Sequence, residues 1–169
     1  MPFQQRQRLG DWPHVILARR QLAEAATDPT TRATLLWELG CAHLSSGDLG
    51  GADADFARSL EAEGTFLPAL RALARLRDAR GDVRASAELY AREARLTKAP
   101  GRAADAFRQA ARLYANQVHD DAMAGRCLEE VLALEPEAET DFEVLDVILR
   151  ARADYDRLAS ALRDRLDRR

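Results

Sequence analysis

The chain has 169 residues, of which 47 % are hydrophobic and 31 % are charged, so it is a folded protein and not a disordered one. Its 25 basic and 28 acidic side chains give a formal net charge of -3, and this near-neutral balance argues against a nonspecific nucleic-acid binder. Because Lys98 is the only lysine, the positive charge is almost entirely arginine, whose forked donors favour bidentate contacts with carboxylates or phosphates.

The hydrophobic pattern predicts an all-α protein. Alternating strand patterns never persist, and Ala, Leu, Arg and Glu recur at helical spacings of three and four. The prolines are compatible with helices, since Pro13 and Pro68 fall in expected first turns and Pro29, Pro100 and Pro136 fall between segments. No helix interior therefore has to accommodate a proline.

A turn dipeptide recurs along the chain and divides it into similar units. Glycine should form the left-handed turn that ends one helix, and aspartate should cap the amides of the next. The successive aspartates are 37, 34, 38 and 34 residues apart, with extra residues around DPTT and KAPG and one in the turn NQVHD. The dipeptides are Gly10-Asp11, Gly47-Asp48 and Gly81-Asp82, with the variants His119-Asp120 and Ala153-Asp154.

The repeat period predicts one helical repeat domain over residues 1–169. The first segment looks like the second helix of a unit that lacks its first helix. The adjacent Val15, Ile16 and Leu17 indicate that this end is poorly capped. In chain order, the expected elements are the second helix of a partial unit at 10–27, followed by hairpins at 30–63, 65–97, 101–136 and 139–168.

These units resemble tetratricopeptide repeats over roughly residues 10–168. The resemblance implies a right-handed α-solenoid of about four hairpins. The small Gly40 and Ala74 would let the second helix of a hairpin approach the first, and Ala52 and Ala124 would do the same from the facing side. The family's pattern is carried by Leu36, Leu39, Gly40, His43, Ala52, Phe56 and Ser59, then by Leu70, Leu73, Ala74, Tyr90 and Ala94, then by Phe107, Ala111, Tyr114, Ala124, Leu128 and Val131, and finally by Phe142, Leu145, Leu149, Tyr155 and Leu166, with departures at Ser86, Glu93, Asp146 and Leu158.

The resemblance also implies a concave binding surface lined by the first helix of each hairpin. Two arginine pairs on that surface are each four residues apart, so the members of a pair share one helix face. If neighbouring first helices stack, the four guanidinium groups converge and can bind carboxylates. Alternatively, these arginines form a solvated face that is balanced by Asp78 and Asp105. The family's clamp for C-terminal carboxylates is absent, because its asparagine positions hold other residues. The expected partner-binding residues are Trp37, Cys41, Leu44, Arg71, Arg75, Arg108, Arg112, Asn116 and Arg150.

Nothing in the sequence points to catalysis, a cofactor or a metal. The histidines are widely separated, and no common catalytic or nucleotide-binding motif is present. His119, Asp120 and Asp121 could form a metal corner, but a turn and helix cap explains them. Cys41 and Cys127 belong to no CxxC pair and are expected to be small buried hydrophobes. With neither a secretory segment nor a membrane span, the expected location is the cytoplasm.

We therefore interpret the chain as a noncatalytic scaffold that binds a protein or acidic peptide in an arginine-lined groove, with Trp37 and Leu44 accepting an apolar anchor. One alternative is a self-assembly module whose uncapped helix ends stack into homo-oligomers. Another is a regulatory module of a larger enzyme. Binding of RNA or another polyanion is disfavoured by the overall acidity and by the lack of aromatic residues beside the arginines.

Overall fold

The computed structural model describes residues 11–167, and within them it contains α-helices, one short π-helical turn and no β-strand. The expected all-α class is therefore confirmed. The elements are α2 (Trp12–Ala25), α3 (Pro29–Ser45), α4 (Leu49–Ala62), α5 (Leu67–Ala79), α6 (Val83–Leu96), α7 (Pro100–Leu113), the π-helical turn η1 (Tyr114–Val118), α8 (Asp121–Leu134), α9 (Glu139–Ala151) and α10 (Tyr155–Leu166).

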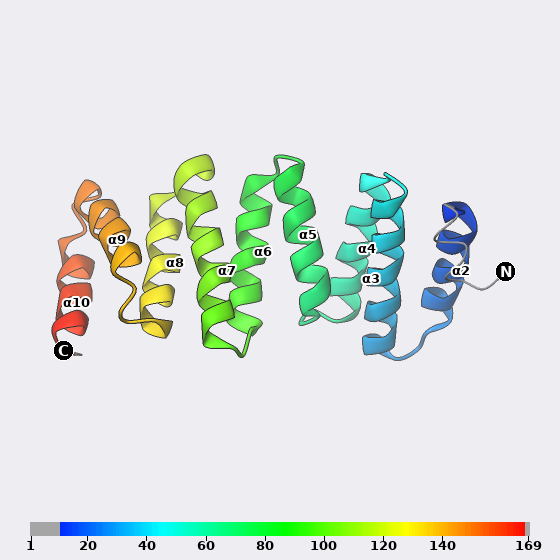
Figure 1. The fold of residues 1–169 in the computed structure, drawn as a ribbon, viewed down its shortest axis with the longest axis horizontal. Coiled ribbons are helices and arrows are strands. Elements are labelled where there is room, and N and C mark those ends of the chain that lie inside the picture. Colours follow the sequence, from blue (N-terminus) through cyan, green and yellow to red (C-terminus); the bar gives the residue numbers. More distant parts are fainter. Residues whose placement is uncertain (1–10, 168–169) are drawn as a thin grey trace. The chain divides into compact units, whose positions relative to one another are not determined.

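The helices divide into two compact units, Met1–Ala79 and Arg80–Arg169. In unit 1, α2 packs on α3, α3 on α4 and α4 on α5 (Figure 1). Its core contains Val15, Leu36, Leu39 and Phe56, each of them almost completely buried. The expected repeat at 65–97 is divided between the units, because α5 belongs to unit 1 and α6 to unit 2.

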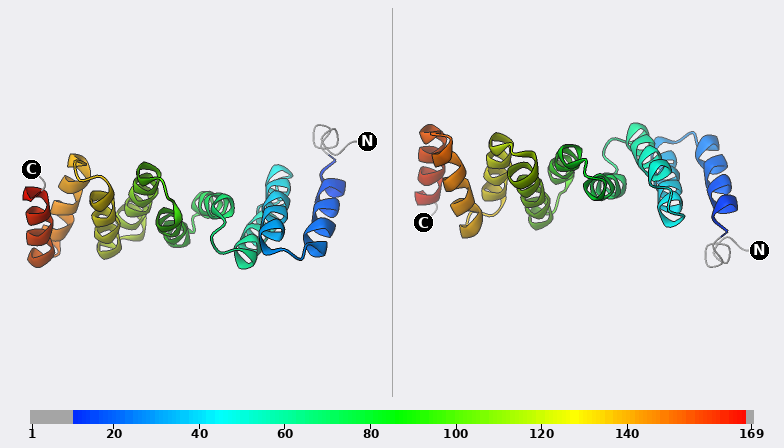
Figure 2. Two further views of the ribbon diagram at one scale, coloured as in Figure 1. Left: turned by 90° about the horizontal axis from the view of Figure 1, so that it is seen from below. Right: turned by 90° about the horizontal axis from the view of Figure 1, so that it is seen from above.

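Unit 2 is a series of helices that each pack on the next in sequence, from α6 to α10. In both views of Figure 2, α9 and α10 lie side by side at the end of this series. One continuous core joins all five helices, and its largest side chains include Phe107, Leu113, Tyr114, Leu128 and Leu149. Most apolar positions of the expected repeats therefore form the interior, as their helical spacing requires, but Tyr155 and Leu166 of the last repeat are exposed.

The recurring turn dipeptides adopt the expected left-handed conformation. Gly47 and Gly81 have φ angles of 85° and 81°, and the variants His119 and Ala153 have 57° and 54°. Gly10 lies outside the described residues. A residue in this conformation ends the helix and reverses the chain, so that the next helix can pack back along the previous one.

The aspartates after these turns differ in how they cap the next helix. The carboxylates of Asp48, Asp120 and Asp154 accept hydrogen bonds from backbone amides at 2.8, 3.1 and 3.4 Å. Asp11 and Asp82 also stand at N-cap positions, but their side chains make no capping bond. Asp11 instead lies 2.6 Å from the Nδ1 of His14. The predicted capping role is thus confirmed at three of the five positions.

Two local expectations need correction. Pro29 and Pro100 do not lie between segments but are the first residues of α3 and α7, where the missing N–H would have no helical partner. The extra residue expected in the turn NQVHD is absorbed by η1, which widens the end of α7 into a π-helical turn. The amide of Asp120 closes this turn on the carbonyl of Tyr114 at 2.8 Å.

Candidate functional site: a cleft beside Trp37 and the arginines of α5 and α7

A cleft of about 370 Å³ lies between α2 and α3 in unit 1. Trp37 and Cys41, both expected to contact a partner, line it together with Trp12 and Arg19. The indole of Trp37 packs edge-on against Phe66, with ring centroids 6.3 Å apart. That contact fixes the indole while its cleft-facing edge stays accessible. Trp12 was not among the predicted contact residues. Those residues were all taken from the first helices of hairpins, whereas Trp12 lies in a second helix that has no predicted first helix.

The polar side of this cleft is internally paired. Arg19 donates a hydrogen bond to Glu38 across the α2–α3 interface. Burial raises the pKa of the Cys41 thiol, and the nearby Arg19 only partly opposes that shift. The thiol is therefore protonated at neutral pH and contributes an apolar surface, but Cys41 is only partly buried, so the expected burial is confirmed for Cys127 and not for Cys41. Leu44, on the next turn of α3, keeps 44 % of its surface exposed.

The two predicted arginine pairs lie on different units. Arg71 and Arg75 are on α5 in unit 1, where Arg71 is partly buried and Arg75 is exposed. Arg108 and Arg112 are on α7 in unit 2. Each pair must therefore be treated as a separate charged surface.

Arg108 is surrounded by acidic groups of its own unit. Its Nε donates to Asp141 at 2.8 Å, one Nη donates to Glu135, and the other donates to Asp105 at 3.2 Å. These bonds raise the pKa of the guanidinium, although it is charged at any physiological pH in either case. A surface depression next to Arg108 is also lined by Glu137 and Glu139, so an acidic partner would meet several carboxylates there.

The remaining predicted contact residues are more accessible. Arg112 is exposed, and it donates only to the neighbouring Gln109 at 2.7 Å among the contacts described. Asn116 is exposed within η1. Arg150 is exposed on α9 and pairs with Asp146 at 2.7 Å, one turn away. Arg112 and Asn116 are therefore better placed for contact than Arg108.

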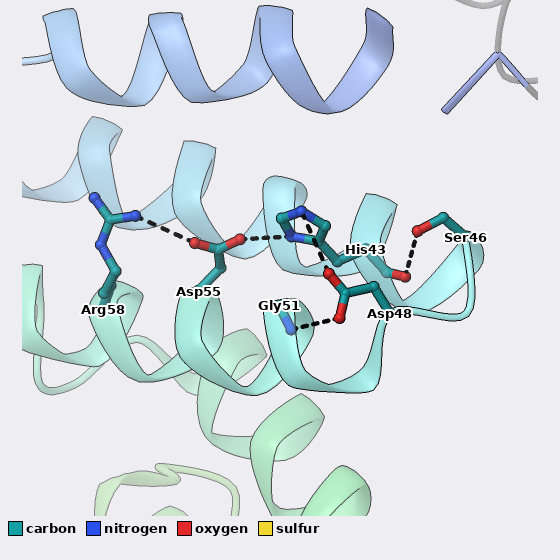
Figure 3. Close-up of polar contacts among 6 residues, drawn as sticks. All are labelled: His43, Ser46, Asp48, Gly51, Asp55 and Arg58. Carbon is teal, nitrogen blue, oxygen red and sulfur yellow. Dashed lines mark hydrogen bonds and ion pairs between the residues drawn. The ribbon is translucent and has the colours of Figure 1, made fainter. Parts of the chain in front are cut away.

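A buried polar cluster between α3 and α4 was not predicted (Figure 3). His43 is buried, as expected, but its Nδ1 lies 2.7 Å from the carboxylate of Asp55, which is also buried. Arg58 reaches the other oxygen of Asp55 at 3.3 Å, and Asp48 lies 4.0 Å from Nε2 of His43. Asp55 lies among the apolar positions of α4, so its polarity alone did not indicate a contact with His43. Only the spacing between the two residues could have indicated this pair. The cluster joins two helices and opens onto no described cavity.

Two kinds of feature are absent from residues 11–167. No group of three or more histidine, cysteine, aspartate or glutamate side chains is placed to hold a metal ion. None of the helices in that range has both the length and the apolar character of a membrane span.

The fold is shared with solved repeat structures. No family model matches the chain, and no curated protein does. A tetratricopeptide repeat protein from Parabacteroides merdae is 17 % identical with a TM-score of 0.59, over 91 % of this chain and 59 % of that one. MamA from Desulfovibrio magneticus is 14 % identical with a TM-score of 0.56, over 98 % and 89 %. The kinesin light chain repeats of Podospora anserina are 17 % identical with a TM-score of 0.57, over 95 % and 88 %. The chain thus has the tetratricopeptide repeat fold.

Proposed function

We propose that the chain is a noncatalytic scaffold that binds a protein or acidic peptide partner. The tetratricopeptide fold is in general an interaction scaffold, and stacked helical hairpins suit this role because they display an extended surface. The observation that supports binding most directly is the cleft between α2 and α3, where aromatic and apolar groups of Trp12, Trp37 and Cys41 remain accessible. Aromatic side chains in such clefts are typical anchors of interfaces.

The proposed contact surface in unit 1 consists of this cleft, Leu44, Arg71 and Arg75. In unit 2 it consists of Arg112, Asn116 and Arg150. Arg108 is left out of the proposed contacts because its donors are already directed at Asp105, Glu135 and Asp141. The exposed arginines would recognise carboxylates of the partner, and the cleft would take an apolar side chain.

The test is quantitative capture from a lysate of the source organism with the immobilised chain. One variant, Leu44→Glu, removes the apolar contact, and a second, Arg75→Glu with Arg112→Glu, reverses the exposed charges. The control is Arg126→Glu, because Arg126 is exposed on α8 outside the proposed surface. A protein captured by the wild type and the control, but lost with both variants, supports the proposal. Equal capture by all four forms contradicts it.

A second candidate function is self-assembly. It is favoured by an exposed apolar stripe on α10, where Tyr155, Leu162 and Leu166 keep 63 %, 40 % and 70 % of their surface exposed. Their spacing of seven and four residues places them on one face of the helix. The molar mass measured by light scattering should then rise with concentration and fall to the monomer value in Leu162→Glu with Leu166→Glu. A constant monomer mass for the wild type excludes this candidate.

A further inference from the structure

A second cavity, of about 350 Å³, lies among α8, α9 and α10 in unit 2. It is distinct from the surface proposed above and shares no residue with it. One side is apolar and includes Leu132, Phe142, Leu145 and Ala161. Its volume falls at the lower end of the roughly 300 to 1,000 Å³ typical of ligand sites, which suits one apolar side chain and its backbone.

The polar side of this cavity is held rigid by ion pairs. Arg157 donates from Nε to Glu129 at 2.9 Å, and its second nitrogen lies 2.8 Å from the other oxygen of the same carboxylate. Arg165 stacks over Phe142 with its guanidinium carbon 4.5 Å from the ring centroid, and it pairs with Glu139. These contacts fix the wall in place before any ligand arrives, which lowers the ordering cost of binding.

Two buried arginine nitrogens of this wall make no hydrogen bond, but one of them, the Nη2 of Arg157, still lies 2.8 Å from the Glu129 carboxylate. The Nη1 of Arg165 is buried and has no hydrogen-bond partner among the residues that the structure describes. A buried donor without an acceptor is costly, so a ligand oxygen at this position would be favoured. Because the lining carries two arginines and two acids, Arg157 and Arg165 against Glu129 and Asp164, it does not select a charged ligand. A neutral carbonyl fits better than a carboxylate.

We propose that this cavity binds one apolar side chain of a partner polypeptide, with a backbone carbonyl beside that side chain accepting a hydrogen bond from Arg165. The inference rests on polypeptide binding as the class of function, but on none of the residues of the surface proposed above. The two proposals can therefore be refuted separately, because the experiment below measures binding at the cavity itself.

The experiment is an NMR titration of the full ¹⁵N-labelled chain with N-acetyl-phenylalaninamide. Saturable shifts are expected at the amides of Leu132, Phe142 and Ala161. N-acetyl-glycinamide, which lacks the side chain, should leave them unchanged. Added salt should have little effect, because the ligand is neutral. Equal shifts with the glycine probe overturn the proposal. Tighter binding of N-acetyl-phenylalanine, which carries a free carboxylate, also overturns it and assigns the cavity to an organic acid.

A matched pair of variants locates the binding. Ala133 lines the cavity at an exposed position, so Ala133→Phe should plug the opening without disturbing the core. Ala151→Phe adds the same side chain at an exposed position of α9 outside the cavity. The apparent Kd should rise at least about tenfold in Ala133→Phe and change by less than about twofold in Ala151→Phe. The spectra themselves report whether each variant is folded. Unchanged binding in a folded Ala133→Phe variant overturns the assignment.

Discussion

The imidazole of His43 and the carboxylate of Asp55 meet at 2.7 Å in the interface between α3 and α4, with both residues more than nine-tenths buried. Removing one member of such a pair leaves the other polar group buried without its partner. His43→Phe should therefore destabilise unit 1 by about 3 kcal/mol, and Asp55→Leu by about 1 to 3 kcal/mol. Urea unfolding followed by tryptophan fluorescence measures this, because Trp12 and Trp37 both belong to unit 1.

The double variant separates pairing from packing. An apolar pair of similar volume often replaces a buried ion pair at little cost, so His43→Phe with Asp55→Leu should cost less than the two single changes added together. The expected coupling is at least about 1 kcal/mol. Simple additivity of the two single variants would show that the bond does not link these residues energetically.

The close approach of α3 and α4 depends on Gly40. A Cβ at this position would lie 2.6 Å from two ring carbons of Phe56, which is completely buried. Gly40→Ala should cost about 1 to 3 kcal/mol through overpacking, despite the better helix propensity of alanine. Gly50→Ala is the matched control in α4, since its nearest described neighbour is an Asp48 oxygen at 3.6 Å. The two variants should differ in urea midpoint, and equal midpoints would contradict the packing role of Gly40.

Local patterns predicted the helices well because their determinants are short-range. The helical spacing of apolar residues fixed the class. The predicted close approach at Gly40 is confirmed by its contact with Phe56. The cap of α3 by Asp28, whose carboxylate bonds the Thr31 amide at 2.8 Å, follows the same rules, although it was not predicted. Such signals need only a few neighbouring residues.

The candidate sites could be predicted only in part, because side-chain partners come from other helices. Nothing in the sequence around Arg108 shows that Glu135 and Asp141 reach it from 27 and 33 residues away. The cavity beside Arg165 likewise exists only where α8, α9 and α10 meet. By contrast, the resemblance to tetratricopeptide repeats predicted Trp37 and Cys41 on one surface, and both line the same cleft. Their role as partner contacts stays a prediction.

Ala153 carries backbone strain that glycine would relieve. Its φ of 54° lies in the left-handed region, where a Cβ costs roughly 1 to 2 kcal/mol. Ala153→Gly should therefore stabilise unit 2 by about 1 kcal/mol. Gly47→Ala, at a φ of 85° in unit 1, should destabilise by a similar amount. Thermal unfolding followed by tyrosine fluorescence reports on unit 2, which holds all three tyrosines, Tyr90, Tyr114 and Tyr155. A lower midpoint for Ala153→Gly would refute the strain argument.

Charge reversal should separate Arg108 from Arg112. Arg108→Glu places a carboxylate among Asp105, Glu135 and Asp141 and should destabilise unit 2 by about 1 to 2 kcal/mol, because this partly exposed network is screened by solvent. Arg112→Glu, one turn away and exposed, should change stability by less than about 0.5 kcal/mol. Tyrosine-detected urea unfolding compares them, and equal stability would show that the Arg108 ion pairs contribute nothing.

The two thiols should differ in accessibility and both be slow to react. Burial raises the pKa of Cys127 to about 11, and the pKa of the partly buried Cys41 is also raised. Little thiolate therefore exists at pH 7, so an aromatic disulfide reagent should modify Cys41 slowly and Cys127 only after unfolding.

The pKa of Cys127 is higher in the folded chain than in the unfolded chain. Its stabilising contribution is therefore present below its ordinary pKa near 9 and is lost as the pH rises toward 11. The protein should become less stable over that alkaline interval, and Cys127→Ala should remove this part of the pH dependence.

Cys41 lines the cleft beside Trp37, so a bound partner should slow its modification further and leave Cys127 unaffected. Unchanged Cys41 kinetics at saturating partner would place the partner elsewhere on the chain.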